Sequence, residues 1–220
     1  MGNIRNQISI LGDSISTFQD FTPPGGVYYG PTFGSVTGVF TPEDTWWMKV
    51  IHALDGDLLV NNSWSGSTVT ASGMLGACSP SRIRKLARDG VLPDIILIYT
   101  GLNDVSRYVP IEEFHQDYTS MLAQIRQAYP KAQVLCGTLI AGYLGDTPFE
   151  KLPFSAQRRR AYNETIRNAA QQTHCQLIDL APFEQGYSSM DGLHPNGVGM
   201  EQLADFWLSA MGLNPEKKPD

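Results

Sequence analysis

Residues 7–16, QISILGDSIS, decide how this chain is organised. The apolar-rich run 8–11 is typical of a buried β-strand, and it stops abruptly at Gly12-Asp13-Ser14. A strand that ends in this way carries the Ser14 hydroxyl at its carboxyl end. Because ligands of α/β proteins bind at that edge of the sheet, Ser14 becomes a candidate site residue if later segments bring partners to it.

The composition is that of one globular domain. The chain has 220 residues, of which 42% are apolar and 17% charged, and we expect a single domain over 1–220. A net charge of −6 and a pI near 5.2 disfavour nucleic acid or an anionic membrane as a partner. Basic clusters at 82–88 and 158–160 are typical of solvated helix faces.

Three cysteines, Cys78, Cys136 and Cys175, lie in unrelated contexts without CxxC spacing, as is usual for reduced thiols in the cytoplasm. The sequence MGNIRNQ (1–7) enters the first strand without the basic and apolar regions of a signal peptide, although a leader removed beforehand would leave no trace. No apolar run has the length of a membrane span. We therefore expect a cytoplasmic protein without membrane contact.

Apolar runs suited to buried strands alternate with helical periodicity along the chain. Thr41 is the expected cap of the first helix and Gly56 its expected end. Alternation of this kind predicts an α/β fold, a three-layer α/β/α sandwich around a parallel sheet. Strands are expected at 8–11, 57–61, 94–99, 133–138 and 176–180, and helices at 42–55, 80–88, 111–129, 155–173 and 197–211, before a frayed tail at 213–220.

Two long segments fit neither periodicity. Residues 17–42 are rich in glycine, proline and aromatic residues, and the aromatic content argues against disorder. This segment could be a lid, a pocket wall or a packed decoration. Residues 139–153 form a second loop with similar punctuation.

Polar motifs follow the predicted strands at the edge where Ser14 lies. In a parallel sheet the carboxyl ends of the strands share one edge, so the topology alone brings five residues together: Ser14, Gly66, Asn103, Asp191 and His194. Each motif by itself is weak, because Gly-Asp-Ser and Asn-Asp are common turn and cap sequences. Four such motifs in this order are much harder to attribute to turns.

These residue types suit acyl transfer. A serine hydroxyl needs a neighbouring base, and His194 lies in an irregular loop at the shared edge, whereas His52, His115 and His174 lie in or beside helices. Asp191, three residues earlier, can accept the His194 Nδ1 proton and fix the tautomer. A structural alternative is that Asp191 is only a turn residue and Asn196 only a helix cap.

A developing oxyanion needs preorganised donors. The backbone N–H groups of Ser14 and Gly66 and the side-chain amide of Asn103 would supply three, and losing one such donor typically costs ~100- to 1,000-fold in turnover. An amide at position 103 donates without titrating, whereas an aspartate would repel the oxyanion.

In four sequence blocks the chain resembles the SGNH hydrolases, also called GDSL-type esterases and lipases. The blocks are Gly12-Asp13-Ser14-Ile15, Asn61 with Ser65-Gly66, Gly101-Leu102-Asn103-Asp104, and Asp191-Gly192-Leu193-His194-Pro195-Asn196. Their order and spacing agree from residue 7 to about 207. Ser63 stands at a position that is often glycine in the family, so we expect the detail of that loop to differ, but not its role.

The resemblance implies a flavodoxin-like sheet of five parallel strands in the order 2-1-3-4-5. It also implies ester hydrolysis through an acyl-enzyme, with no metal or other cofactor. In this analogy Ser14 is the nucleophile, and Asp13 and Asp104 are supporting residues that orient their loops.

The substrate is open within the family. Aromatic residues near the shared edge are candidate substrate contacts that could stack on a sugar or line an acyl pocket: Tyr28, Tyr29, Trp64 and Tyr143. Because no segment is typical of an interfacial lipid anchor, we expect a small-molecule or glycan ester as the partner, and removal of an acetyl or other short acyl group from a carbohydrate or similar polar carrier.

Other activities are alternatives. A lysophospholipase or thioesterase would act on longer acyl chains, and a non-catalytic domain on the same fold would bind a glycan or peptide. A nucleotide-binding protein is disfavoured, because both GxxxxGK[ST] and GxGxxG are missing from the sequence. A metal hydrolase is disfavoured by the lack of clustered metal ligands in the sequence. The oligomeric state is left open.

Overall fold

The computed structural model describes residues 5–23, 25–72, 75–145 and 156–213. Five parallel strands form its central sheet, in the order β2-β1-β3-β4-β6. The strands are β1 (Asn6–Gly12), β2 (Gly56–Ser63), β3 (Ile95–Tyr99), β4 (Gln133–Gly137) and β6 (Gln176–Ile178). Parts of the expected second loop (146–153) and of the expected frayed tail (214–220) lie outside the described residues.

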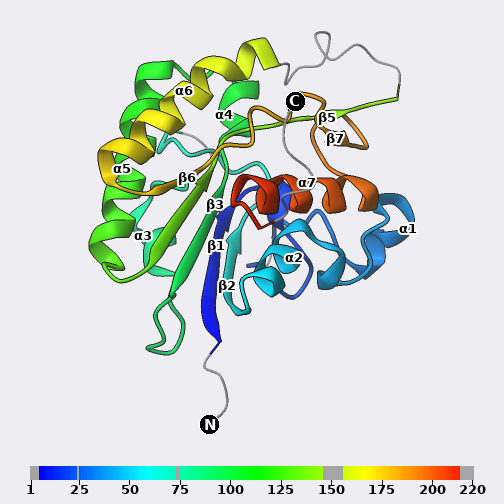
Figure 1. Cartoon of the computed structure of the whole chain (residues 1–220), viewed down its shortest axis with the longest axis horizontal. Helices are drawn as coiled ribbons and strands as arrows, with labels where there is room; N and C mark the ends of the chain where they lie inside the picture. Colours follow the sequence, from blue (N-terminus) through cyan, green and yellow to red (C-terminus); the bar gives the residue numbers. More distant parts are fainter. Residues whose placement is uncertain (1–4, 24, 73–74, 146–155, 214–220) are drawn as a thin grey trace.

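Helices cover both faces of the sheet, which makes the three layers visible in Figure 1. On one face α2 (Trp46–Ala53) packs against α7 (Gly197–Ala210). The opposite face carries α3 (Pro80–Arg84), α5 (Ile111–Ala128) and α6 (Ala156–Thr173). The predicted flavodoxin-like sandwich is confirmed, and so is its strand order, with β6 as the fifth strand of the sheet.

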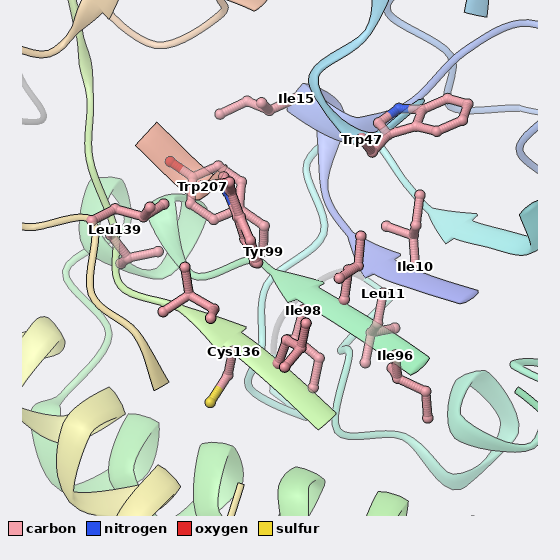
Figure 2. Close-up of a cluster of buried hydrophobic side chains, with 14 of the residues drawn as sticks. Ile10, Leu11, Ile15, Trp47, Ile96, Ile98, Tyr99, Cys136, Leu139 and Trp207 are labelled. Carbon is pink, nitrogen blue, oxygen red and sulfur yellow. The ribbon is translucent and has the colours of Figure 1, made fainter. Parts of the chain in front are cut away.

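The strands are buried because both of their faces are covered. All five residues of β3 are buried, and Ile96 and Ile98 point towards the side of α5 and α6 together with Cys136 of β4. Trp47 and Trp207 lie on the opposite side of the sheet (Figure 2). This division follows from the two-residue period of a strand, which sends alternate side chains to opposite faces.

An aromatic cluster fixes α2 and α7 to the sheet. The rings of Trp46 and Trp207 stack with centroids 5.0 Å apart, and Tyr99 meets both edge-on at 5.7 and 6.1 Å. The Tyr99 hydroxyl donates to the carbonyl of Ile140, so its burial leaves no orphan polar group. Such offset aromatic contacts add about 0.5–1.5 kcal/mol per pair beyond area burial.

The order of the strands places a switch point beside β1. From β1 the chain passes to β2 on one side, and then returns to β3 on the other side. The crevice between the ends of β1 and β3 is where ligands of such sheets bind. Ser14, one residue beyond Asp13 at the end of β1, stands at this crevice.

The helix expected from 42 onward begins later. Residues Pro42–Asp44 form a short 3₁₀ turn, and α2 starts at Trp46 with Thr45 as its N-cap. The Thr45 hydroxyl accepts the N–H of Met48 and donates to the carbonyl of Pro42. Gly56 opens β2 instead of ending the helix, because Asp55 takes the left-handed conformation with φ 49°.

Other expected boundaries shift as well. The helix expected at 80–88 ends at Arg84, and the GLND motif begins a short helix, α4 (Leu102–Ser106). Two short strands that the sequence did not predict, β5 (Gly142–Tyr143) and β7 (Tyr187–Ser188), pair in parallel within the loops that follow β4 and β6. The β5–β7 pair ties the loop after β4 to the loop that carries His194.

The segment 17–42 packs against the body of the protein. Phe18, Tyr29 and Val39 are buried in the core, and the segment contains the 3₁₀ turn Pro31–Phe33 and the short helix α1 (Gly34–Thr37). Its described part is therefore packed against the core through these side chains. No helix of the described residues is long and apolar enough to cross a bilayer.

The two threonines before α2 offer a test of where that helix begins. Thr45→Val keeps the side-chain shape but leaves the buried N–H of Met48 without its acceptor, so we expect a loss of about 1–2 kcal/mol in the free energy of unfolding. Thr41→Val is the matched control: Thr41 is exposed, and Asp44 still accepts its backbone N–H, so we expect a loss of no more than about 0.5 kcal/mol. Urea denaturation measures both, and equal losses would contradict the assignment of Thr45 as the cap.

Candidate active site

Ser14 is the first residue of a single 3₁₀ turn, Ser14–Ser16, at the end of β1. Asp13 caps this turn, because its Oδ1 accepts the N–H of Ile15 at 3.1 Å. Gly12 is required by close packing: a Cβ there would lie 2.7 Å from Ser63 Oγ and 2.8 Å from Ser16. The Ser63 hydroxyl in turn donates to Asn61 Oδ1, so the serine at this position fits the turn.

The structure brings His194 and Asp191 to Ser14 across the width of the site. His194 Nε2 lies 2.9 Å from Ser14 Oγ, and His194 Nδ1 lies 2.7 Å from Asp191 Oδ2. The other carboxylate oxygen of Asp191 accepts the backbone N–H groups of Leu193 and His194. Asp191 is thus a turn residue and a partner of the imidazole at once.

Hydrogen bonds set the charge of Asp191. Burial acts to raise the pKa of this carboxyl, but the hydrogen bonds from the ring and the backbone of His194 outweigh it and lower the pKa to about 2. Asp191 is therefore ionised throughout the neutral range, as a group that stabilises an imidazolium must be.

The three expected oxyanion donors lie on three separate segments that follow β1, β2 and β3. Gly66 has φ 73°, a left-handed conformation that glycine adopts without strain. Asn103, in α4, donates one amide hydrogen to the carbonyl of Ser67 at 2.9 Å, which leaves the other for a ligand. Among the described residues, the N–H groups of Ser14 and Gly66 have no hydrogen-bond acceptor.

Asp104 holds the loop that follows Gly66. Its two carboxylate oxygens accept the N–H groups of Val69 at 2.8 Å and Thr70 at 3.2 Å. Burial raises the pKa of Asp104 to about 6, against the lowering effect of these backbone bonds. The family resemblance predicts that Asp104 orients its loop, and these two hydrogen bonds support that prediction.

Arg82 is buried, and its prediction as part of a solvated helix face is wrong. Its guanidinium donates to the carbonyls of Gly12 at 3.0 Å and Asn62 at 2.6 Å, where β1 and β2 end. It also donates to the Ser67 hydroxyl and to the Leu75 carbonyl, on the loop beyond Gly66. Nothing in the local sequence distinguishes it from Arg84, which is exposed. Arg159 in the 158–160 cluster is buried as well.

The aromatic candidates separate into different roles. Tyr29 is fully buried and its hydroxyl donates to the carbonyl of Pro195, so its prediction as a substrate contact is wrong. Tyr28 is partly buried, and its ring stacks on that of His194. Trp64 donates to Asn62 Oδ1, and Tyr143 lies in β5; both are partly exposed.

As a unit, these residues can move a proton from a serine hydroxyl to an imidazole and hold a negative oxygen nearby. The geometry is that required for nucleophilic attack on an acyl carbon. Within the described residues, no three or more His, Cys, Asp and Glu side chains are grouped to hold a metal ion.

The family model of the GDSL-like lipases/acylhydrolases matches residues 6–211. It agrees with the family resemblance of the four sequence blocks, which is thereby confirmed. No curated protein matches the chain.

Solved structures share the fold over nearly the whole chain. A protein from Bacteroides ovatus ATCC 8483, assigned to the GDSL-like lipases, is 26% identical with a TM-score of 0.71, and the match covers 96% of this chain and 99% of that one. A counterpart from Bacteroides uniformis ATCC 8492 is 24% identical with a TM-score of 0.69, over 94% and 96% of the two chains. The esterase EstA from Pseudoalteromonas, whose structure was solved inhibited by monoethylphosphonate, is 19% identical with a TM-score of 0.57, over 96% and 100%.

The buried carboxyl of Asp13 predicts a pH-dependent stability. Burial raises its pKa to about 7, although the Ile15 N–H and the nearby His194 and Arg82 act against this. Between the unfolded pKa of 3.8 and this value, the folded protein holds a proton that the unfolded chain has lost, so stability falls as the pH rises. Asp13→Asn keeps the acceptor for Ile15 and should remove this loss.

We compare the free energy of unfolding of Asp13→Asn with that of the wild type at pH 5 and at pH 8. The difference should shift in favour of Asp13→Asn by on the order of 2–4 kcal/mol from the lower to the higher pH. Urea denaturation at the two pH values measures this shift. Asp20→Asn, at an exposed position, is the control for replacing a carboxylate by an amide elsewhere on the chain. A constant difference for Asp13→Asn would show that its carboxyl is ionised across this range.

Proposed function

The chain belongs to the GDSL-like lipase/acylhydrolase family and is a serine hydrolase of ester bonds, and we propose that Ser14 is its nucleophile and a short acyl ester its substrate. In this proposal His194 is the general base, Asp191 orients it, and Ser14, Gly66 and Asn103 hold the oxyanion. The acyl group is acetyl or of similar size, and its carrier is a carbohydrate or another polar molecule.

One observation carries the mechanism: the hydrogen-bonded line from Asp191 through His194 to Ser14. Its two links measure 2.7 and 2.9 Å, within the range that proton transfer requires. Residues 180 positions apart meet in this line, which a turn or a helix cap alone would not require.

In the first half-reaction, Ser14 Oγ attacks the carbonyl carbon of the ester while its proton passes to His194 Nε2. The carbonyl oxygen becomes an oxyanion that accepts hydrogen bonds from the Ser14 and Gly66 N–H groups and from the Asn103 amide. The tetrahedral intermediate then collapses: the carbon–oxygen bond to the alcohol breaks, and His194 returns the proton to that oxygen.

In the second half-reaction, water takes the place of the alcohol. His194 accepts a proton from the water molecule while the water oxygen attacks the acyl carbon. The same donors hold the second oxyanion. Breaking the bond to Ser14 Oγ releases the carboxylic acid and returns the proton to the serine.

Exposure at the site supports a small acyl group. Ser14 is only 4% exposed and the His194 side chain 13%, so solvent reaches little of the nucleophile and its base. The Asp191 side chain is 45% exposed, which leaves water on the other side of the imidazole for a polar carrier. Trp64 and Tyr143 are the remaining aromatic candidates for contact with such a carrier.

The preference for acyl length and the role of Ser14 are tested together. We expect the kcat/KM of the wild type for 4-nitrophenyl acetate and butyrate to be at least about tenfold higher than for the octanoate and decanoate. The reason is that Ser14 is buried, so a longer acyl chain should fit less well beside it. Ser14→Ala should lower kcat by at least about 1,000-fold on every ester.

Each opposite result points to a named alternative. A rate that rises with chain length would identify a lysophospholipase or thioesterase. Activity unchanged in Ser14→Ala would remove Ser14 from the mechanism. Absence of turnover on all esters and on acetylated sugars would favour a non-catalytic glycan- or peptide-binding domain.

A further inference from the structure

Residues 26–29, which we call the strap, contact three separate parts of the site. The carbonyl of Gly26 accepts both the N–H and the hydroxyl of Ser65, at 3.0 and 2.7 Å, on the loop that carries Gly66. The N–H of Tyr28 donates to Thr17 Oγ1 at 2.9 Å, and this hydroxyl donates to the carbonyl of Ser14 at 2.8 Å. The strap thus connects the oxyanion loop to the turn of the nucleophile.

Side chains of the strap reach the third part, the loop of His194. The rings of Tyr28 and His194 are stacked, with centroids 3.8 Å apart and planes 7° from parallel. Next in the chain, the buried Tyr29 donates through its hydroxyl to the carbonyl of Pro195 at 2.8 Å. Tyr29 therefore anchors the strap, while Tyr28 covers one face of the imidazole.

This stacking limits how the imidazole can turn. Nδ1 and Nε2 have to point at Asp191 and Ser14 at the same time, and both atoms lie in the plane of the ring. A parallel aromatic ring 3.8 Å away resists rotation out of that plane. The covered face of Tyr28 is also unavailable for stacking on a sugar, which was one of the two uses predicted for this residue.

We propose that Tyr28 is a positioning residue for His194, which holds the imidazole in the line with Ser14 and stabilises its protonated form through the π face of the phenol ring. The proposal rests on the proposed function of His194 as the base. A cation over an aromatic face is stabilised to an extent that corresponds to ~2- to 30-fold in an equilibrium.

Several charged and titratable groups face His194, and the test has to keep them constant. Asp191 lies on the same loop, Asp13 acts on it from the end of β1, and the Tyr28 phenol comes from the strap. Burial and the nearby Asp191 carboxylate raise the pKa of Tyr28, so its hydroxyl stays neutral at working pH.

Two substitutions separate the ring from its hydroxyl. Tyr28→Leu keeps an apolar cover over the imidazole but removes the π face. Tyr28→Phe keeps the face and removes the hydroxyl together with its hydrogen bond to Asp191, so it measures that contribution alone. We expect Tyr28→Leu to lower kcat for 4-nitrophenyl acetate by about 5- to 30-fold with KM changed less than about threefold. Tyr28→Phe should stay within about threefold of the wild type.

If Tyr28 had only a structural role, its replacement would leave the titration of the His194 imidazole unchanged, so this titration is the deciding measurement. We expect the midpoint of the His194 ring titration, followed by ¹⁵N NMR and assigned with His194→Ala, to fall in Tyr28→Leu and to stay close to the wild-type value in Tyr28→Phe. The acidic limb of the kcat/KM profile should move to lower pH in parallel.

The outcomes keep this proposal apart from the proposed function. An unchanged His194 midpoint in folded Tyr28→Leu would overturn the role of Tyr28, even if kcat falls. A raised KM with unchanged kcat would make Tyr28 a substrate contact instead. If the wild type hydrolyses no ester, the proposed function fails, while the NMR titration still decides whether Tyr28 favours the protonated imidazole.

Discussion

The hydrogen bonds of the buried Arg82 guanidinium hold together the loops that carry the site. The guanidinium donates hydrogen bonds to the carbonyls of Gly12 and Asn62, where β1 and β2 end. It also donates to the Ser67 hydroxyl and the Leu75 carbonyl, on the loop beyond Gly66. Removing an arginine from water costs several kcal/mol, which these hydrogen bonds from a charged donor offset. Burial lowers the pKa of Arg82 to about 10, which still leaves it charged at neutral pH. One planar group thereby joins the end of β1, beside the nucleophile turn, to the loop beyond Gly66.

Around this group the site is built from two kinds of carboxyl. Asp13 and Asp104 are buried and bind backbone N–H groups, and burial raises the pKa of each. Asp191 is half exposed, and its bonds to His194 keep it ionised. Carboxyls that shape loops can tolerate partial protonation, whereas the partner of an imidazolium has to stay negative. Their environments divide these tasks between residues of one chemical type.

Much of this arrangement could be predicted from the sequence, because it follows from the topology. The continuous apolar run DIILIY at 94–99 is suited to a strand covered on both faces, and parallel strands bring Ser14, Asn103 and His194 to one edge. The burial of Arg82 could not be predicted, since its acceptors come from residues 20 and 70 positions away. Nor could Tyr28 and Tyr29 be told apart: they are neighbours of the same type in a segment without periodicity, and only the packing assigns one to His194 and the other to the core.

The central claim is that Ser14 is a hydroxyl made nucleophilic by His194 and Asp191. Labelling by a fluorophosphonate probe tests it most directly, because such a probe reacts with an activated serine and needs no knowledge of the natural ester. We predict one label per chain, found by peptide mass spectrometry on Ser14, with none in Ser14→Ala and slow labelling in His194→Ala. An unlabelled wild-type chain, or a label on any other residue, would contradict the account.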